Sequence, residues 1–119
     1  MIRAVPGTAG GYGSETFRVT VTRDDGTALV TVGGELDLLT APELQRAIDE
    51  VVADRPRRVV LDLRALEFMG SSGVAMIQRL GALARAYGFT AALVRGNPRV
   101  ERILAIAGLS DQLQFVDAP

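Results

Sequence analysis

The sequence Phe68-Met69-Gly70-Ser71-Ser72-Gly73 joins a predicted strand to a predicted helix. Before it, Val59-Val60-Leu61-Asp62-Leu63 is apolar and rich in β-branched residues, as buried strands are. After it, apolar residues recur at helical spacing from Val74 onward. A helix begins with free N–H groups and a partial positive charge. The junction therefore predicts an α/β fold with two serine hydroxyls at a helix start.

The same two periodicities organise the rest of the chain. Strands are predicted over 17–21, 28–32, 59–63, 89–94 and 114–116, and helices after 40, 73 and 97. The order β-β-α-β-α-β-α-β predicts an α/β fold: a mixed, mostly parallel β-sheet with helices packed against it. We expect a single domain over 16–119. Residues 1–15, rich in Gly, Ala, Ser and Thr, are expected to form a flexible N-terminal leader.

Local signals mark where several of these elements begin and end. Thr40, with Pro42 in the first turn and Glu43 three residues later, predicts a helix start with a capping box. Gly33-Gly34 is expected to end the second strand. Gly88 is expected to cap the second helix at its C-terminus.

Composition excludes several classes of function. The 119 residues suit one domain, and the net charge of −1 gives no basis for binding nucleic acid or an anionic membrane. All thirteen basic residues are arginine, and the chain has no cysteine and no histidine. Disulfides, thiolate sites and imidazole catalysis are therefore excluded. We expect a cytoplasmic protein that is not an enzyme and needs no metal or cofactor; no signal peptide or membrane-spanning run is recognisable.

Ser71 and Ser72 allow two interpretations. One serine could cap the helix while the other is merely small, since serine is common at that position. Alternatively, Gly70 and Gly73 leave a hydroxyl free of bulky neighbours and accessible to a partner. A serine-hydrolase elbow does not fit, because the glycine spacing differs and no histidine can act as the base.

Acidic residues outside the serine pair are also open to two interpretations. Glu35 and Asp37 lie in Gly34-Glu35-Leu36-Asp37, which could be a solvated loop between strand and helix. If the loop lies beside Ser71, the two acids could instead bind a metal or a basic partner, although two carboxylates alone are a weak signal. Asp62 interrupts an apolar strand, and we expect it to point outward at the strand end, because burial would require a partner.

Three parts of the sequence together resemble the STAS domain family. They are Gly34-Glu35-Leu36-Asp37 followed by Thr40-Ala41, then Val60-Leu61-Asp62-Leu63, then Phe68-Met69-Gly70-Ser71-Ser72-Gly73-Val74. The resemblance covers about 16–116 and is strongest to the bacterial anti-sigma factor antagonists. It implies a sheet with helices on one side and a serine at the helix start that switches binding.

The resemblance also implies a function. An antagonist of this kind binds an anti-sigma factor, which is itself a serine kinase, and so releases a sigma factor; a serine phosphatase would be a further partner. In that pattern Ser71 is the phosphorylated residue, Asp37 lies beside it and Thr40 opens the first helix. The expected partner-binding residues are Glu35, Asp37, Thr40, Gly70, Ser71, Ser72 and Gly73.

One position departs from the family pattern and supports an alternative. The family usually has an acid directly before the switch serine, whereas this chain has Gly70. The alternative is a STAS subunit that docks to the ATPase of a transport complex without phosphorylation. A small α/β enzyme or nucleotide binder is a second rival, and the lack of His, Cys, Lys and a glycine-rich phosphate loop counts against it.

Overall fold

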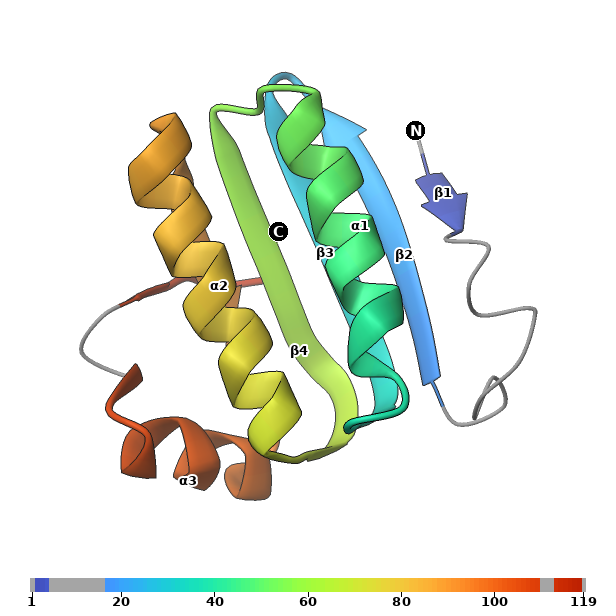
Figure 1. Ribbon diagram of the computed structural model, residues 1–119, viewed down its shortest axis with the longest axis vertical. Coiled ribbons are helices and arrows are strands. Elements are labelled where there is room, and N and C mark those ends of the chain that lie inside the picture. Colours follow the sequence, from blue (N-terminus) through green and yellow to red (C-terminus); the bar gives the residue numbers. More distant parts are fainter. Residues whose placement is uncertain (1, 5–16, 110–112, 119) are drawn as a thin grey trace.

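A computed structural model describes residues 2–4, 17–109 and 113–118 of the chain. Along the described sequence the elements alternate between strands and helices after three opening strands (Figure 1). They are β1 (Ile2–Ala4), β2 (Phe17–Asp24), β3 (Thr27–Leu36), α1 (Ala41–Ala53), β4 (Arg58–Met69), α2 (Ser71–Tyr87), β5 (Thr90–Val94), α3 (Pro98–Ile106) and β6 (Gln114–Phe115).

The strands form one sheet in the order β1-β2-β3-β4-β5-β6. Strands β1, β2 and β3 pair antiparallel, and β3 to β6 pair parallel, so the predicted mixed, mostly parallel sheet is confirmed from β2 onward. The expectation of a leader is wrong for Ile2–Ala4, which pairs with β2 through backbone hydrogen bonds that need no side-chain pattern. The rest of the expected leader, residues 5–16, lies outside the described residues.

The core lies between the sheet and its helices. Helices α1 and α2 run side by side across the same face of the sheet (Figure 1). Alternate residues of the strands meet the apolar stripes of these helices, as their two periodicities require. The largest fully buried side chains are those of Phe17, Leu36, Leu44, Ile48, Leu61, Leu63, Leu66, Met69, Ile77, Leu80, Leu93 and Leu104. A smaller apolar cluster of Val60, Ala92 and Val94 lies apart from this core.

Strand β3 continues through Gly33 and Gly34, which contradicts the expectation that these glycines end it. A Cβ atom on Gly33 would lie 2.6 Å from the Arg18 guanidinium, so glycine lets that side chain cross the strand. Gly34 has a φ of 88°, which favours glycine, and the pairing with β4 shifts at this point. The strand recovers and reaches Leu36, which positions the loop that follows.

Asp62 is buried, with 2% of its surface exposed, so the expectation that it points outward is wrong. Its carboxylate accepts hydrogen bonds from the Arg64 backbone N–H at 3.0 Å and from the Arg64 guanidinium at 2.7 Å. Burial by itself would raise the pKa of Asp62, but the hydrogen bonds and charge of Arg64 outweigh it and hold the pKa below its ordinary value. The required partner comes from the same strand, two residues away.

Candidate functional site

Two segments that are far apart in the sequence meet at one edge of the sheet. Strands β3 and β4 are parallel, Leu36 pairs with Met69, and both strands end there. The N–H of Gly70 donates to the carbonyl of Leu36 at 2.9 Å. The loop after β3 and the start of α2 are therefore neighbours, as the positions of β3 and α2 in Figure 1 show. Glu35 at the end of β3, Asp37 in the loop that follows and Ser71 at the start of α2 therefore share one edge of the sheet, as expected.

Ser71 is the first residue of α2, which confirms the expected helix start. The residue before it, Gly70, is the N-cap, with an extended backbone (φ −93°, ψ −171°), and no side chain caps the helix. Neither serine is therefore the cap. Ser71 is exposed and Ser72 is half-buried. The geometry favours the second interpretation of the pair, a hydroxyl presented to solvent.

Gly70 and Gly73 differ in what a side chain would meet. A Cβ atom on Gly73 would lie 2.3 Å from Met69 Cγ and 2.9 Å from Leu36 Cδ2, so glycine lets α2 press against both strand ends. A Cβ atom on Gly70 would meet only ordinary contacts, the nearest being Phe68 Cε2 at 3.6 Å. Gly73 therefore fixes the position of the helix, whereas Gly70 leaves its first turn uncovered.

The loop after β3 is held by its own side chains. The Asp37 carboxylate accepts hydrogen bonds from the N–H groups of Leu39 and Thr40 at 3.0 and 3.1 Å. The Thr40 hydroxyl donates to the Glu35 carbonyl at 2.8 Å and accepts from the Asp37 N–H at 2.9 Å. Thr40 is only 2% exposed, and Gly73 is also buried, so both can shape this surface but neither presents a side chain to a partner.

The expected capping box at the start of α1 is wrong. Thr40 is the N-cap residue, but its hydroxyl bonds to the loop and makes no cap hydrogen bond. Glu43 is 5% exposed, and its Oε2 atom has no hydrogen-bond partner within the described part of the chain. Burial raises the pKa of Glu43, and the charge of Arg46 offsets only part of that effect.

Four large apolar side chains are exposed on segments at or near the edge that carries Ser71, and the sequence reasoning missed them as a group. Leu38 and Leu39 follow β3 and are 77% and 59% exposed, Phe68 near the end of β4 is 49% exposed, and Ile106 at the end of α3 is 79% exposed. In the sequence, the only indication of this exposed apolar group was the pair of adjacent leucines between a predicted strand and a predicted helix start. Clustered exposed apolar residues mark interaction surfaces.

Glu35 and Asp37 differ in how their carboxylates are used. Asp37 already uses one carboxylate oxygen on the loop, and Glu35 is exposed. No group of three or more potential His, Cys, Asp or Glu ligands occurs among residues 2–4, 17–109 and 113–118. Asp37 therefore helps to hold the loop, whereas the Glu35 carboxylate remains accessible.

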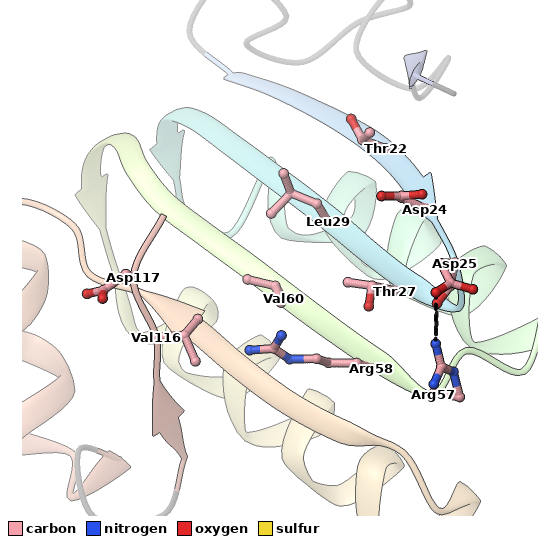
Figure 2. A pocket seen from close by; sticks show the side chains of 10 residues that line it. All are labelled: Thr22, Asp24, Asp25, Thr27, Leu29, Arg57, Arg58, Val60, Val116 and Asp117. Carbon is pink, nitrogen blue, oxygen red and sulfur yellow. Dashed lines mark hydrogen bonds and ion pairs between the residues drawn. The ribbon is translucent and has the colours of Figure 1, made fainter. Parts of the chain in front are cut away.

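A separate hollow of about 480 Å³ lies on the sheet, away from Ser71 (Figure 2). An ion pair between Arg57 and Asp25, at 3.7 Å, bounds one end of it. Carboxylates and guanidinium groups are mixed around an apolar floor, and none of the predicted site residues reaches it. It is lined by Thr22, Asp24, Asp25, Thr27, Leu29, Arg57, Arg58, Val60, Val116 and Asp117.

None of the helices in the described segments is both long enough and apolar enough to cross a membrane. This result concerns helices α1, α2 and α3.

Comparisons with known proteins agree with the fold. The STAS domain model matches residues 18–118. The anti-sigma-F factor antagonist RsfB of Mycobacterium tuberculosis is 48% identical over 63 residues, which is 53% of this chain and 52% of RsfB, so the match spans about half the length of that relative. The anti-sigma F factor antagonist of Paenibacillus polymyxa is 35% identical over 77% of this chain and 80% of its own.

A solved structure extends the comparison to three dimensions. The crystal structure of an anti-sigma factor antagonist from Mycobacterium paratuberculosis superimposes with a TM-score of 0.75 and 33% identity, covering 87% of this chain and 88% of that one. Residue 71 lies within the range that the STAS domain model matches. The chain belongs to the STAS domain family and is a homologue of bacterial anti-sigma factor antagonists.

Proposed function

We propose that this protein is a cytoplasmic anti-sigma factor antagonist, which binds an anti-sigma factor and so releases a sigma factor for transcription. The observation that supports this most directly is Ser71, exposed at the uncapped start of α2 beside the Glu35–Asp37 loop. On this proposal the protein is a regulator that acts by binding and not an enzyme, in keeping with its homology to antagonists.

The proposed contact surface comprises the accessible members of the predicted set. Glu35, Ser71 and Ser72 would contact the anti-sigma factor through their side chains, and Gly70 through its backbone. Thr40 and Gly73 are buried and would act by holding the loop and the helix start in place. The exposed leucines at 38 and 39 would add apolar contact area.

Phosphorylation of Ser71 is the proposed switch. A kinase-type anti-sigma factor would transfer a phosphoryl group from a nucleotide to the Ser71 oxygen, and a serine phosphatase would remove it by hydrolysis. The phosphate adds about 1.5 to 2 negative charges at pH 7, which the start of a helix tolerates. Within a packed interface, the same charge must lose water close to the carboxylate of Glu35, and this opposes binding.

The test combines binding and modification. The full chain is titrated calorimetrically with the kinase-type anti-sigma factors of its own genome, and then incubated with the binding partner and ATP before mass-spectrometric mapping. We expect binding, followed by phosphate on Ser71, because Ser72 is half-buried. Phosphate on Ser72 alone would contradict the switch assignment, and absence of binding to every such factor would contradict the function.

A second candidate function rests on Gly70. A STAS subunit of a transport complex would dock to its ATPase without phosphorylation, and the missing acid before Ser71 fits a serine that is not modified. The two candidates make different predictions for the same incubation. Tight binding to an anti-sigma factor supports the first candidate, whereas binding to a transporter ATPase with no phosphate incorporated supports the second.

A further inference from the structure

An apolar groove of about 380 Å³ runs between the first half of α2 and the end of α3. Ser71 lies on its α2 side, and Ile106, which is 79% exposed, lies on its α3 side. Apart from Ser71 and Gln78, its lining side chains are apolar. The groove is lined by Met69, Gly70, Ser71, Val74, Ala75, Gln78, Ile103, Ile106 and Ala107.

Two arginines of α3 precede groove residues by one helical turn. Arg99 lies four residues before Ile103, and Arg102 lies four residues before Ile106, so both lie one turn along α3 on the side of the groove. Both are exposed, and neither forms an ion pair within the described segments. The nearby Glu101 carboxylate already forms an ion pair with Arg95 at 2.8 Å.

We propose that this groove receives an amphipathic helix of the anti-sigma factor, whose acidic residues pair with Arg99 and Arg102. Two helices with an apolar channel between them present ridges into which a third helix can pack. Recognition of this kind uses apolar side chains at helical spacing as anchors. The unpaired guanidinium groups select carboxylates on the flank of the incoming helix. This inference rests on the proposed function.

The groove also explains how modification of one residue could control binding. Ser71 is part of its lining, so a phosphate on Ser71 would lie at the groove and beside the carboxylates of the incoming helix. Like charges at a partly desolvated interface repel strongly, and the phosphate would also interrupt the apolar contact. Unmodified Ser71 has neither effect. Phosphorylation would therefore close this groove to an acidic helix without moving α2 or α3.

The test uses full-length variants that alter the groove and not the loop. Ile106→Ser removes an exposed anchor, and Arg102→Glu reverses a charge. Ala75→Arg places a long side chain in the groove while keeping a good helix former. Matched controls are Tyr87→Ser, which removes an apolar side chain that is 70% exposed at the far end of α2, and Arg85→Glu, which reverses an exposed charge there.

Titration calorimetry against the anti-sigma factor is expected to show at least tenfold weaker binding for each groove variant and less than a twofold change for the controls. Thermal melts check that each variant folds. If Ile106→Ser does not fold, the affinity of Ala75→Arg tests the groove proposal. Wild-type affinity in all folded groove variants would overturn the groove proposal and leave the proposed function intact. Absence of binding by the unaltered chain would overturn both.

Discussion

The starts of α2 and α3 are built in opposite ways. Helix α3 has Asn97 as its N-cap, and the Asn97 side chain accepts a hydrogen bond from the Val100 N–H at 3.0 Å. The same side chain donates to the carbonyl of Leu66 at 3.0 Å, which ties α3 to β4. Helix α2 has Gly70 as its N-cap and receives no side-chain hydrogen bond.

The difference separates a structural helix start from a functional one. An asparagine cap satisfies an N–H group that would otherwise need water, and it stabilises the fold. A glycine at the same position forgoes that stabilisation and leaves the first turn open to solvent or to a partner. The exposed Ser71 stands at the open start, which is where a modification or a binding partner needs access.

The largest effect is expected at the capped start. Asn97→Ala removes both the cap and the link to Leu66, and it should lower the free energy of unfolding by about 2 kcal/mol. Urea denaturation measures the change. Asn97→Asp is the control, because it keeps the capping oxygen, loses the donor, and should lie between wild type and Asn97→Ala. An unchanged midpoint for Asn97→Ala would show that the two starts do not differ in this way.

At the open start, the expected effect is on binding. Ser71→Asp should weaken binding to the anti-sigma factor at least tenfold, or about 1.4 kcal/mol, because a carboxylate there must lose water. Ser71→Ala should keep the affinity, and both variants should stay folded to within about 1–2 kcal/mol. Titration calorimetry with thermal melts tests this. If both variants fold and bind with equal affinity, Ser71 does not lie in the interface.

Giving α2 a cap should sharpen the comparison. The backbone of Gly70 is extended and its Cβ position is free of clashes, so Gly70→Asp should cap the helix and raise the free energy of unfolding by about 0.5 kcal/mol. Capping lowers the pKa of an aspartate. The gain should therefore be present above the unfolded-state pKa of about 3.9 and be lost as the pH falls through the folded-state value.

Urea denaturation at pH 7 and at acidic pH measures this gain. Gly70→Asn is the matched control, because it can cap the helix but cannot titrate, so its gain should persist in acid. If Gly70→Asp instead lowered the free energy of unfolding at pH 7, the uncapped start of α2 would not cost the protein stability.

An effect of similar size is expected at the third helix start, that of α1. Glu43 is buried there with a raised pKa and an unpartnered oxygen, so ionising it costs folding free energy. Glu43→Gln should raise the free energy of unfolding by about 0.5 kcal/mol at pH 7. Because the raised pKa disfavours only the charged form, the gain should shrink as the pH falls toward about 4.3, the ordinary value for Glu.

Denaturation midpoints across this pH range give the measurement, and Glu35→Gln, at an exposed acid, is the control. A gain at pH 7 that stays the same in acid would show that charge burial is not its cause.

Periodicity predicted the element order and much of the core. Val100 and Leu104, four residues apart on α3, are both buried, as a single apolar stripe at helical spacing requires. The extra strand Ile2–Ala4 was missed because three residues are too few to show an alternating hydrophobic pattern. Its pairing depends on the backbone of β2. At Gly33 the Arg18 side chain from β2 occupies the space of a Cβ atom, a contact that the sequence of β3 alone does not indicate.

The sequence predicted where the candidate site lies, but it predicted less well which side chains are exposed there. The glycines and serines identified the helix start, and parallel strand ends placed the loop of Glu35 beside it. The exposure of Ile106 depends on how the end of α3 packs, which its own sequence does not determine. The burial of Asp62 was missed because its partner, Arg64, lies two residues along the same strand, where the pairing with β3 shifts register.

The hydrogen bond from the Gly70 N–H to the Leu36 carbonyl makes that amide proton a natural probe of the switch. Its resonance in a nitrogen–proton correlation spectrum depends on whether the two segments stay together, and its exchange with deuterium is slow only while they do. Since Gly73 presses α2 onto both strand ends, the segments should stay together whether or not Ser71 is modified. Deuterium exchange at Gly70 can thus distinguish a change of surface charge from a change of shape without any label on the interface.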